Sequence, residues 1–356
     1  MRDTYGSSEG PLRVALVTPS YAPAIRGNAI TVARLQHHLE ARGAEVKIWD
    51  MGGRDDISAL AKDILDFKPT VVHGFHACRF SRVAHRIRQT SHTPIVVTVT
   101  GTDVNISLYI SDTRRITARC LRTAGAVVFF ASETARRVSE DVSLLEENVH
   151  IIPQAVELPE AQKVEIPFSK SEDGFVFCMP AGLRAVKNVL FPIAPLHSLR
   201  TEFPNISLLY AGPVVEQHTA DSLMQEIEGL PWVKYIGDVP HDQMAHLYRM
   251  CDVVVNSSLS EGMSGALMEA MSMGTPVLAS NVEANRAIIE DGVDGLLFDT
   301  EQDFMRQATR LIKDPNLRAS LGARAAERMR GDHSPETEAA SYEQLYRDLA
   351  RATNEG

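Results

Sequence analysis

Short apolar runs alternate with segments whose apolar residues recur every three to four positions along most of this 356-residue chain. The short runs predict buried strands, and the periodic segments predict helices that cover them. The chain opens with a predicted strand at Leu12–Thr18, a helix at Ala29–Arg42 that Gly43 ends, and a strand at Glu45–Trp49. Strands that alternate with helices predict parallel sheets covered on both faces, and therefore an α/β protein.

The alternation falls into two blocks, separated by an irregular polar segment at 157–173 that contains two prolines and that we interpret as a linker. A chain of this length is expected to form two domains, because a single hydrophobic core rarely grows so large. The predicted organisation is a disordered tail (1–10), a first domain (11–156), the linker (157–173), a second domain (174–334) and a C-terminal helix (335–356) that packs back toward the first domain. Two doubly wound, Rossmann-like domains would place their binding loops opposite each other across a cleft.

Further strands are expected in both blocks. In the first block they are Thr70–His73, Ile95–Thr100, Ala126–Phe130 and Val149–Ile152. In the second block they are Phe175–Met179, Ser207–Ala211, Val233–Ile236, Val253–Asn256, Pro276–Ala279 and Leu296–Phe298.

Composition narrows the class of protein. No stretch of about 18 apolar residues occurs, so no transmembrane helix is expected. The four cysteines form no CxxC pair, which argues against zinc and disulfide frameworks and fits a reducing cytoplasm. The net charge of −10 argues against a nucleic-acid partner.

The charge is unevenly distributed. Residues 1–155 carry 19 Lys and Arg against 16 Asp and Glu, a net charge of +3, so the remainder carries −13. In the first half, four arginines have spacings that could share a helical face: Arg114, Arg115, Arg119 and Arg122. They permit an anionic acceptor or a peripheral contact with a membrane surface, and ordinary solvation explains them equally well.

The segment Ser260–Ser280 (SEGMSGALMEAMSMGTPVLAS) carries the most specific signal. A buried strand leads through a small polar loop into a helix near Ser264, and free N–H groups at such a helix start suit phosphate or sugar oxygens. Glu269 lies inside this otherwise apolar helix, where burying an unpartnered carboxylate would cost several kcal/mol. Ribose hydroxyls could satisfy it. A solvent-facing position or a pair with an arginine are the alternatives.

In this strand-loop-helix-strand context, the spacing E-x7-E of Glu261 and Glu269 resembles the signature of the retaining family 4 glycosyltransferases of the GT-B fold. The stretch from Tyr235 to Ser280 is similar throughout to that family's donor half. The stretches RGNAITVARLQHHLE (26–40), GTDVN (101–105) and GLRAVK (182–187) resemble a narrower branch, that of glycosyltransferase 1 domain-containing protein 1.

The resemblance implies a donor site in the second domain. Glu269 would bind the ribose hydroxyls, and Glu261 would bind hydroxyls of the transferred sugar. Arg184 and Lys187 would neutralise the diphosphate leaving group, because fixed cations stabilise the charge that it develops. Further donor-binding residues implied are Gly262, Met263 and Ser264 through their backbone, Gly237, and Gly27 and Asn28 of the first domain.

The resemblance also implies an acceptor or sugar side in the first domain, at Thr100, Gly101, Thr102 and Asp103. Many relatives have a histidine where Thr100 stands, and EANRA at 283–287 replaces a frequent glycine pair and glutamate, so this chain departs from the family at both positions. His73 and His76 are expected on the acceptor side. We do not interpret HxxH as a metal site, because no third ligand is spaced nearby and family members work without a bound metal.

The function implied is retaining transfer of a sugar from a nucleoside-diphosphate sugar, with UDP favoured, to an unidentified acceptor, without metal or cofactor. A GT-B nucleotide-sugar epimerase and a non-catalytic nucleotide-sugar-binding protein are the alternatives. A Rossmann oxidoreductase is disfavoured because no G-x-G-x-x-G follows the first strand.

Overall fold

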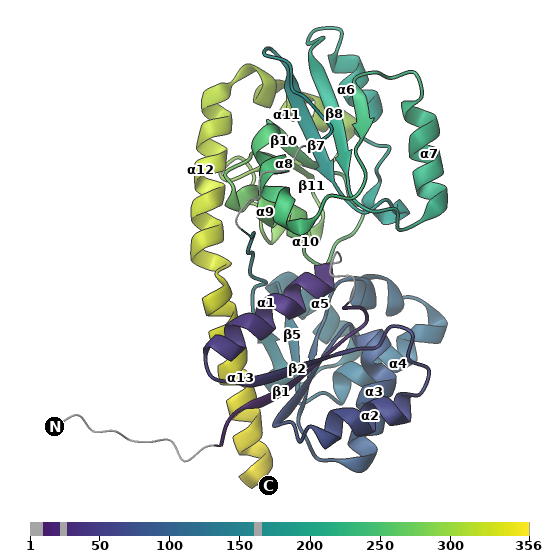
Figure 1. The fold of residues 1–356 in the computed structure, drawn as a ribbon, viewed down its shortest axis with the longest axis vertical. Helices are drawn as coiled ribbons and strands as arrows, with labels where there is room; N and C mark the ends of the chain where they lie inside the picture. Colours follow the sequence, from purple (N-terminus) through teal and green to yellow (C-terminus); the bar gives the residue numbers. More distant parts are fainter. Residues whose placement is uncertain (1–9, 22–26, 160–165, 356) are drawn as a thin grey trace, which may run out of the picture. The chain divides into compact units, whose positions relative to one another are not determined.

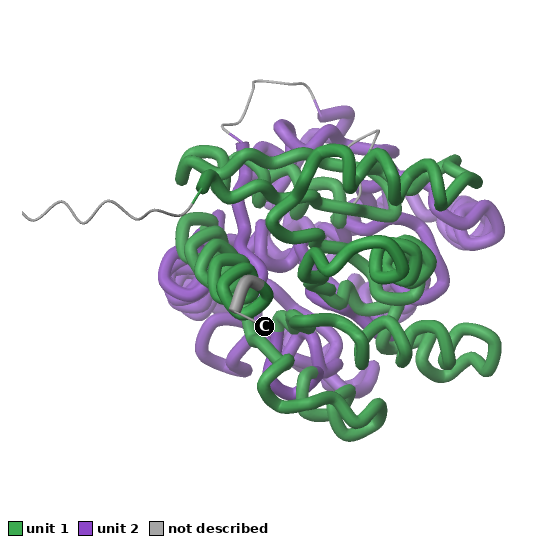
Figure 2. Tube along the Cα trace, turned by 90° about the horizontal axis from the view of Figure 1, so that it is seen from below, with its two compact units in different colours: residues 1–130, 135–152, 335–356 green, residues 131–134, 153–334 purple. Residues whose placement is uncertain are grey.

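The computed structural model of the chain describes residues 10–21, 27–159 and 166–355 (Figure 1). Most of the tail predicted at 1–10, and residues 160–165 of the predicted linker, lie outside the described residues. The chain divides into two compact units (Figure 2). Unit 1 comprises residues 1–130, 135–152 and 335–356, and unit 2 comprises residues 131–134 and 153–334. The C-terminal helix thus belongs to the same unit as the first half of the chain.

Unit 1 is built on a parallel six-stranded sheet with the order β2-β1-β3-β4-β5-β6. Its strands are β1 (Arg13–Thr18), β2 (Glu45–Asp50), β3 (Val71–Phe75), β4 (Ile95–Thr98), β5 (Ala126–Phe129) and β6 (Val149–Ile151). Its helices are α1 (Gly27–Ala41), α2 (Ile57–Asp66), α3 (Ala77–Thr90), α4 (Ser111–Arg122), α5 (Ser132–Val142) and α13 (Pro335–Glu355), with short turns η1 (Asp103–Ser107) and η2 (Glu146–Asn148).

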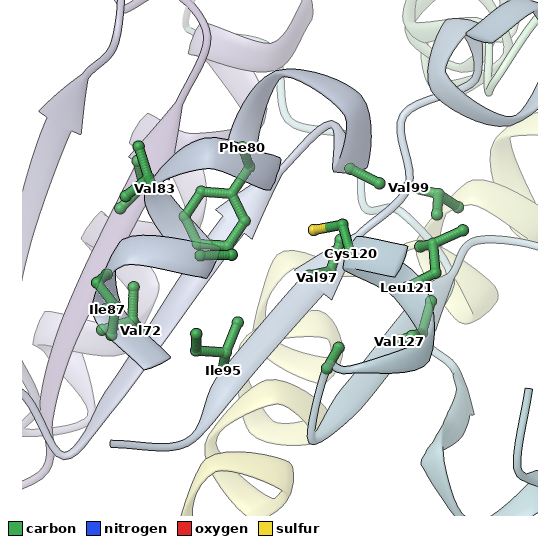
Figure 3. Close-up of a cluster of buried hydrophobic side chains, with 14 of the residues drawn as sticks. Val72, Phe80, Val83, Ile87, Ile95, Val97, Val99, Cys120, Leu121 and Val127 are labelled. Atoms are coloured by element: carbon green, nitrogen blue, oxygen red, sulfur yellow. The ribbon is translucent and has the colours of Figure 1, made fainter. Parts of the chain in front are cut away.

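Helices cover both faces of this sheet, because most of its strand residues are buried. On one face, α2, α3, α4 and α5 bury a common core, part of which Figure 3 shows, with Ile87 of α3 beside Val72 of β3. On the other face, the helical core residues among those described come from α1 and the C-terminal helix α13. Without α13, the apolar face beside α1 would be open to water.

Polar groups as well as apolar residues attach α13 to this face. The guanidinium of Arg34 on α1 donates to both carboxylate oxygens of Glu338 at 3.0 and 3.1 Å, and both side chains are buried. His73 of β3 hydrogen-bonds with the Tyr346 hydroxyl at 2.6 Å and, through Nε2, with Thr98 at 2.7 Å. The Thr98 hydroxyl also meets the hydroxyl of Tyr342 at 3.0 Å. These contacts explain why a polar strand residue such as His73 is tolerated in the core.

Unit 2 is built on a second parallel six-stranded sheet, with the order β12-β11-β10-β7-β8-β9. Its strands are β7 (Phe175–Pro180), β8 (Ile206–Ala211), β9 (Val233–Tyr235), β10 (Val253–Asn256), β11 (Val277–Ser280) and β12 (Leu296–Phe298). Its helices are α6 (Ile193–Leu199), α7 (Gln217–Ile227), α8 (Met244–Met250), α9 (Gly265–Ser272), α10 (Glu283–Arg286), α11 (Glu301–Lys313) and α12 (Pro315–Asp332), with short turns η3 (Ala185–Lys187) and η4 (His241–Gln243).

This strand order is that of the Rossmann fold, in which the chain winds outward in one direction and then in the other. Helices α6, α7 and α11 cover one face of the sheet, and α8, α9 and α12 cover the other. No helix among the described residues is both long and apolar enough to cross a bilayer.

The buried imidazole of His73 predicts an acid-sensitive unit 1. Burial lowers the pKa of His73 to about 3, whereas the unfolded chain titrates near the ordinary value of about 6.5. Below pH 6.5 the unfolded state therefore binds a proton at His73 that the folded state does not bind. The free energy of unfolding falls as the pH drops through this range. We expect a loss of about 3 kcal/mol between pH 6.5 and pH 4.

The measurement is urea unfolding at several pH values, followed by the fluorescence of Trp49, which is buried in unit 1. Trp232, the other tryptophan, is replaced by phenylalanine so that only unit 1 reports. The variant His73→Asn should lose most of this pH slope, while replacement of the exposed His92 by Asn should keep it. An unchanged slope in His73→Asn would refute the assignment.

Candidate functional site

The winding of the chain in unit 2 reverses between strands β7 and β10. Strands β7 and β10 are neighbours in the sheet, but the chain leaves β7 toward β8 and leaves β10 toward β11 on the opposite side. Ligands of doubly wound proteins bind at this switch point, outside the carboxyl ends of the strands. The two loops that begin there contain Arg184 and Lys187 after β7, and Glu261 after β10.

Backbone and side-chain contacts hold these two loops together. The Leu259 amide donates to the carbonyl of Val186 at 2.9 Å. The hydroxyl of Ser257 donates to the carbonyl of Asn188 at 2.9 Å and lies 3.2 Å from that of Lys187. The η3 turn therefore has a fixed position relative to the loop after β10, and residues from both loops can act on one ligand.

A buried ion pair forms the centre of the site. The Lys187 ammonium contacts Oε1 of Glu261, and their side chains are 14% and 6% exposed. The same oxygen accepts from Ser258 Oγ at 2.7 Å and from Asn256 Nδ2 at 3.1 Å. Burial, the largest influence, would raise the pKa of Glu261, but the Lys187 charge and these hydrogen bonds hold it below its ordinary value. Glu261 is therefore a fixed anion at neutral pH.

The second carboxylate, that of Glu269, is buried in the middle of α9 and has two protein partners. The hydroxyl of Tyr248 on α8 donates to Oε2 at 2.7 Å, and His241 Nε2 lies 3.1 Å from Oε1. Burial and the adjacent Glu269 charge raise the pKa of Tyr248 well above its ordinary range, so it remains a donor. Protein groups thus supply part of the hydrogen bonding for which the sequence analysis offered ribose hydroxyls, solvent or an arginine.

Glu269 retains room for a ligand in its hydrogen bonding. A carboxylate has about four acceptor positions, and Tyr248 and His241 occupy two of those on Glu269. Ser264 starts α9, and its hydroxyl lies 3.2 Å from Asn256 Nδ2, so Asn256 joins the start of this helix to Glu261. Free amides at the helix start and two carboxylates can together recognise hydroxyl and phosphate groups.

The remaining predicted residues of unit 2 lie along the same edge of the sheet. Gly262 and Met263 are half-buried in the loop before α9. Gly237 follows β9 with a φ of +80°, and its carbonyl accepts from the Gly212 amide at 2.7 Å. The half-buried Arg184 precedes η3, and no ion pair is recorded for its guanidinium within residues 166–355.

In unit 1, the structure brings together several residues predicted on the acceptor side. The ring of His76, which precedes α3, lies 3.1 Å from the hydroxyl of Thr102 in the loop after β4. Burial lowers the pKa of His76, so the neutral imidazole is favoured. Thr100 is half-buried and Gly101 has a φ of +110° in the same loop.

Two predicted residues of unit 1 have structural roles in this fold. The fully buried carboxylate of Asp103 accepts four backbone N–H groups, those of Ala77, Thr100, Gly101 and Val104. His73 lies in the core with both ring nitrogens bonded, so its expected position on the acceptor side is corrected. Asp103 shapes the loop, and His73 holds α13.

Gly27 and Asn28 form the first turn of α1, at the β1–β3 switch point of unit 1. Gly27 is exposed, and its carbonyl accepts from the Thr31 hydroxyl at 3.0 Å.

Sequence reasoning missed the residues that position the two carboxylates: Asn256, Ser258, Tyr248 and His241. Asn256 and Ser258 had a usable signal, because polar residues directly after a buried strand lie at the binding edge of a parallel sheet. Tyr248 and His241 had none, since they contact Glu269 only through the packing of α8 and η4 beside α9.

Two Rossmann-like units with these strand orders define the GT-B fold. Residues 162–328 match the family model described as glycosyl transferases group 1. Over 91% of its length and 94% of the relative, the chain is 27% identical to glycosyltransferase 1 domain-containing protein 1 of Xenopus tropicalis.

Two solved structures have the same fold. Sucrose-phosphate synthase from Thermosynechococcus elongatus superposes with a TM-score of 0.81 at 18% identity, covering 96% of this chain and 100% of that one. HepE from Anabaena, solved in complex with UDP and glucose, superposes with a TM-score of 0.76 at 16% identity, covering 94% and 99%.

The buried ion pair predicts a strongly asymmetric response to mutation. Lys187→Met should destabilise unit 2 by about 3–5 kcal/mol, because it leaves Glu261 buried without its cation. The double variant Lys187→Met/Glu261→Gln should recover much of that loss, since no uncompensated charge remains. Urea unfolding followed by the fluorescence of Trp232, with Trp49 replaced by phenylalanine, measures both.

Lys313 provides the control, because its ion pair with Glu202 is more than half exposed. Lys313→Met should cost less than about 1 kcal/mol. Equal losses in the single and double variants at Lys187 would contradict a buried, charge-compensated pair.

Proposed function

We propose that this protein is a retaining, metal-independent glycosyltransferase that moves a sugar from a nucleoside-diphosphate sugar, with UDP favoured, to an acceptor nucleophile. The proposal rests on the buried Lys187–Glu261 pair at the switch point of unit 2, together with Glu269 in the helix that starts there. The match of residues 162–328 to the group 1 family model supports the reaction class.

The two carboxylates have different tasks in this proposal. Glu269, held by Tyr248 and His241, accepts the ribose hydroxyls at its remaining positions. Glu261, held as an anion, accepts hydroxyls of the transferred sugar. Partners that fix a carboxylate in advance reduce what the ligand must order on binding.

Arg184 and Lys187 face the departing diphosphate. Lys187 has three donors and uses one on Glu261, and no ion pair is recorded for Arg184 within residues 166–355. The bond between the anomeric carbon and the diphosphate oxygen breaks, and a bond to the acceptor oxygen forms on the same face. The acceptor proton passes to the leaving diphosphate. The protein contributes position and positive charge.

Two further features of the proposal concern the donor and the compartment. HepE, which has the same fold, is described in complex with UDP and glucose, which favours a UDP-sugar here. The four cysteines are free, as a reducing cytoplasm would keep them.

The donor site predicts a selective loss in Glu269→Ala. Removing the carboxylate should weaken UDP binding about 10- to 100-fold, because two charge-assisted hydrogen bonds to ribose are lost. Calorimetric titration with UDP measures the effect. Glu327→Ala, which removes an exposed carboxylate on α12, should bind as the parent protein does. Unchanged binding by folded Glu269→Ala would exclude the ribose role.

The reaction itself is tested by incubating the protein with UDP-, GDP- and ADP-sugars and a panel of acceptors, with mass spectrometry of the products. We expect a glycosylated acceptor whose anomeric configuration, read from its proton NMR coupling, equals that of the donor. An altered nucleotide sugar formed without acceptor would identify an epimerase. Tight donor binding without any turnover would identify a binding protein.

A further inference from the structure

Basic residues are concentrated in a short part of unit 1. Residues 77–122 contain eight arginines, no lysine and two aspartates, a net charge of +6 in a chain whose total is −10. The rest of the chain therefore carries −16. This segment consists of α3, β4, η1 and α4, and α3 and α4 pack side by side on one face of the sheet.

Six of the eight arginines lie on the exposed sides of the two helices, whereas Arg88 is half-buried. The apolar side of each helix is buried, as Figure 3 shows for Phe80, Val83 and Ile87 of α3 and for Cys120 and Leu121 of α4. Exposed arginines follow the opposite side of each helix at intervals of three or four residues. They are Arg79, Arg82 and Arg86 on α3, and Arg115, Arg119 and Arg122 on α4.

These six arginines have no acidic partner in the part of the chain that the structure describes. Asp103 is buried and accepts backbone amides, and Asp141 pairs with Arg114. On the adjacent α2, Asp66 pairs with Lys62. A surface with six arginines that form no ion pair within the described residues, and with one exposed aspartate, Asp112, therefore covers two neighbouring helices, at a cost in mutual repulsion that an anionic partner would relieve.

Exposed apolar side chains occur in the segment before α4 and on α4 itself. Ile106, Tyr109, Ile110 and Ile116, of η1, its following loop and α4, are 41–59% exposed. Hydrogen bonds hold the segment from Asn105 to Tyr109 in place. Arg137 donates to the Tyr109 hydroxyl at 3.0 Å and to Asn105 at 2.7 Å, and Arg114 donates to the carbonyl of Leu108 at 2.8 Å.

We propose that this α3–α4 face, formed by the six arginines and the four apolar residues, docks unit 1 onto an anionic lipid bilayer. Guanidinium groups bind lipid phosphates and carboxylates, and isoleucine and tyrosine side chains enter the boundary between headgroups and acyl chains. This inference does not depend on the proposed sugar transfer.

The apolar residues and the charge of the rest of the chain favour a bilayer over a nucleic acid. Exposed isoleucines gain nothing from a phosphate backbone, whereas a bilayer offers an apolar layer directly beneath its charged surface. A bilayer is flat and contacts the α3–α4 face alone, so the net charge of −16 on the rest of the chain stays away from the lipid headgroups.

The test is flotation of the full-length protein with vesicles of equal parts phosphatidylserine and phosphatidylcholine, compared with vesicles of phosphatidylcholine alone. We expect binding to the anionic vesicles that weakens when salt rises from about 0.1 M to about 1 M, because the Debye length falls from about 10 Å to about 3 Å. Replacing Arg115, Arg119 and Arg122 together by Gln should weaken binding on the order of 100-fold, about fivefold per arginine.

Two further variants separate this face from a general charge effect. Replacing Arg249, Arg324 and Arg330, which are exposed on unit 2, by Gln makes the same change in net charge and should leave binding intact. The double variant Ile110→Ser/Ile116→Ser should also weaken binding, since it removes the inserting side chains without changing charge.

Three outcomes would overturn the proposal. They are no flotation of the parent protein at low salt, equal weakening by the two arginine triples, and retention of single-stranded RNA in a gel-shift assay without vesicle binding. The last outcome would assign the face to nucleic acid. The assay uses no sugar donor, so failure of the proposed transfer reaction would leave its result unaffected.

Discussion

The ion pair between Lys187 and Glu261 is the contact on which the candidate site depends. It joins the loops that leave β7 and β10, the two neighbouring strands from which the chain departs in opposite directions. A carboxylate that is 6% exposed cannot remain charged without such a partner, and the partner in turn fixes the η3 turn. Asn256 in turn links Glu261 to the hydroxyl of Ser264 at the start of α9.

Unit 2 stabilises its two buried carboxylates in different ways, and the difference suits their proposed tasks. Glu261 has a cation and two uncharged donors on one oxygen, so its charge and orientation are set before any ligand arrives. Glu269 has a tyrosine hydroxyl and an imidazole nitrogen, one on each oxygen. These partners orient the carboxylate and leave acceptor positions for incoming hydroxyl groups. A rigid anion beside the sugar and an oriented acceptor beside the ribose are what recognition of a nucleotide sugar requires.

The sequence predicted the strands and helices because parallel strands buried on both faces read as short apolar runs, and each strand lies within a few residues of its expected position. It also indicated that α13 needs an apolar surface, since Tyr342 and Tyr346 recur on one side. Side-chain direction was harder to predict. His73 and His76 look alike in the HxxH pattern, but one lies inside a strand and the other in the loop after it. The contact between Tyr248 and Glu269 joins two helices, so no local pattern contains it.

The two faces of the unit 1 sheet differ in how their charges are balanced. On the face that α1 and α13 cover, the chain provides its own counter-charges: Arg34 pairs with Glu338, and Arg42 pairs with Glu343. The acidic residues of α13 thus form ion pairs with basic residues of unit 1 that lie about 300 residues away in the sequence. On the α3–α4 face no such exchange occurs, and six arginines remain without acidic partners within the described residues. One face of unit 1 thus balances its charges internally, and the α3–α4 face does not. The α3–α4 face also carries exposed apolar side chains. Both features are best explained by a bilayer surface that supplies the missing negative charge.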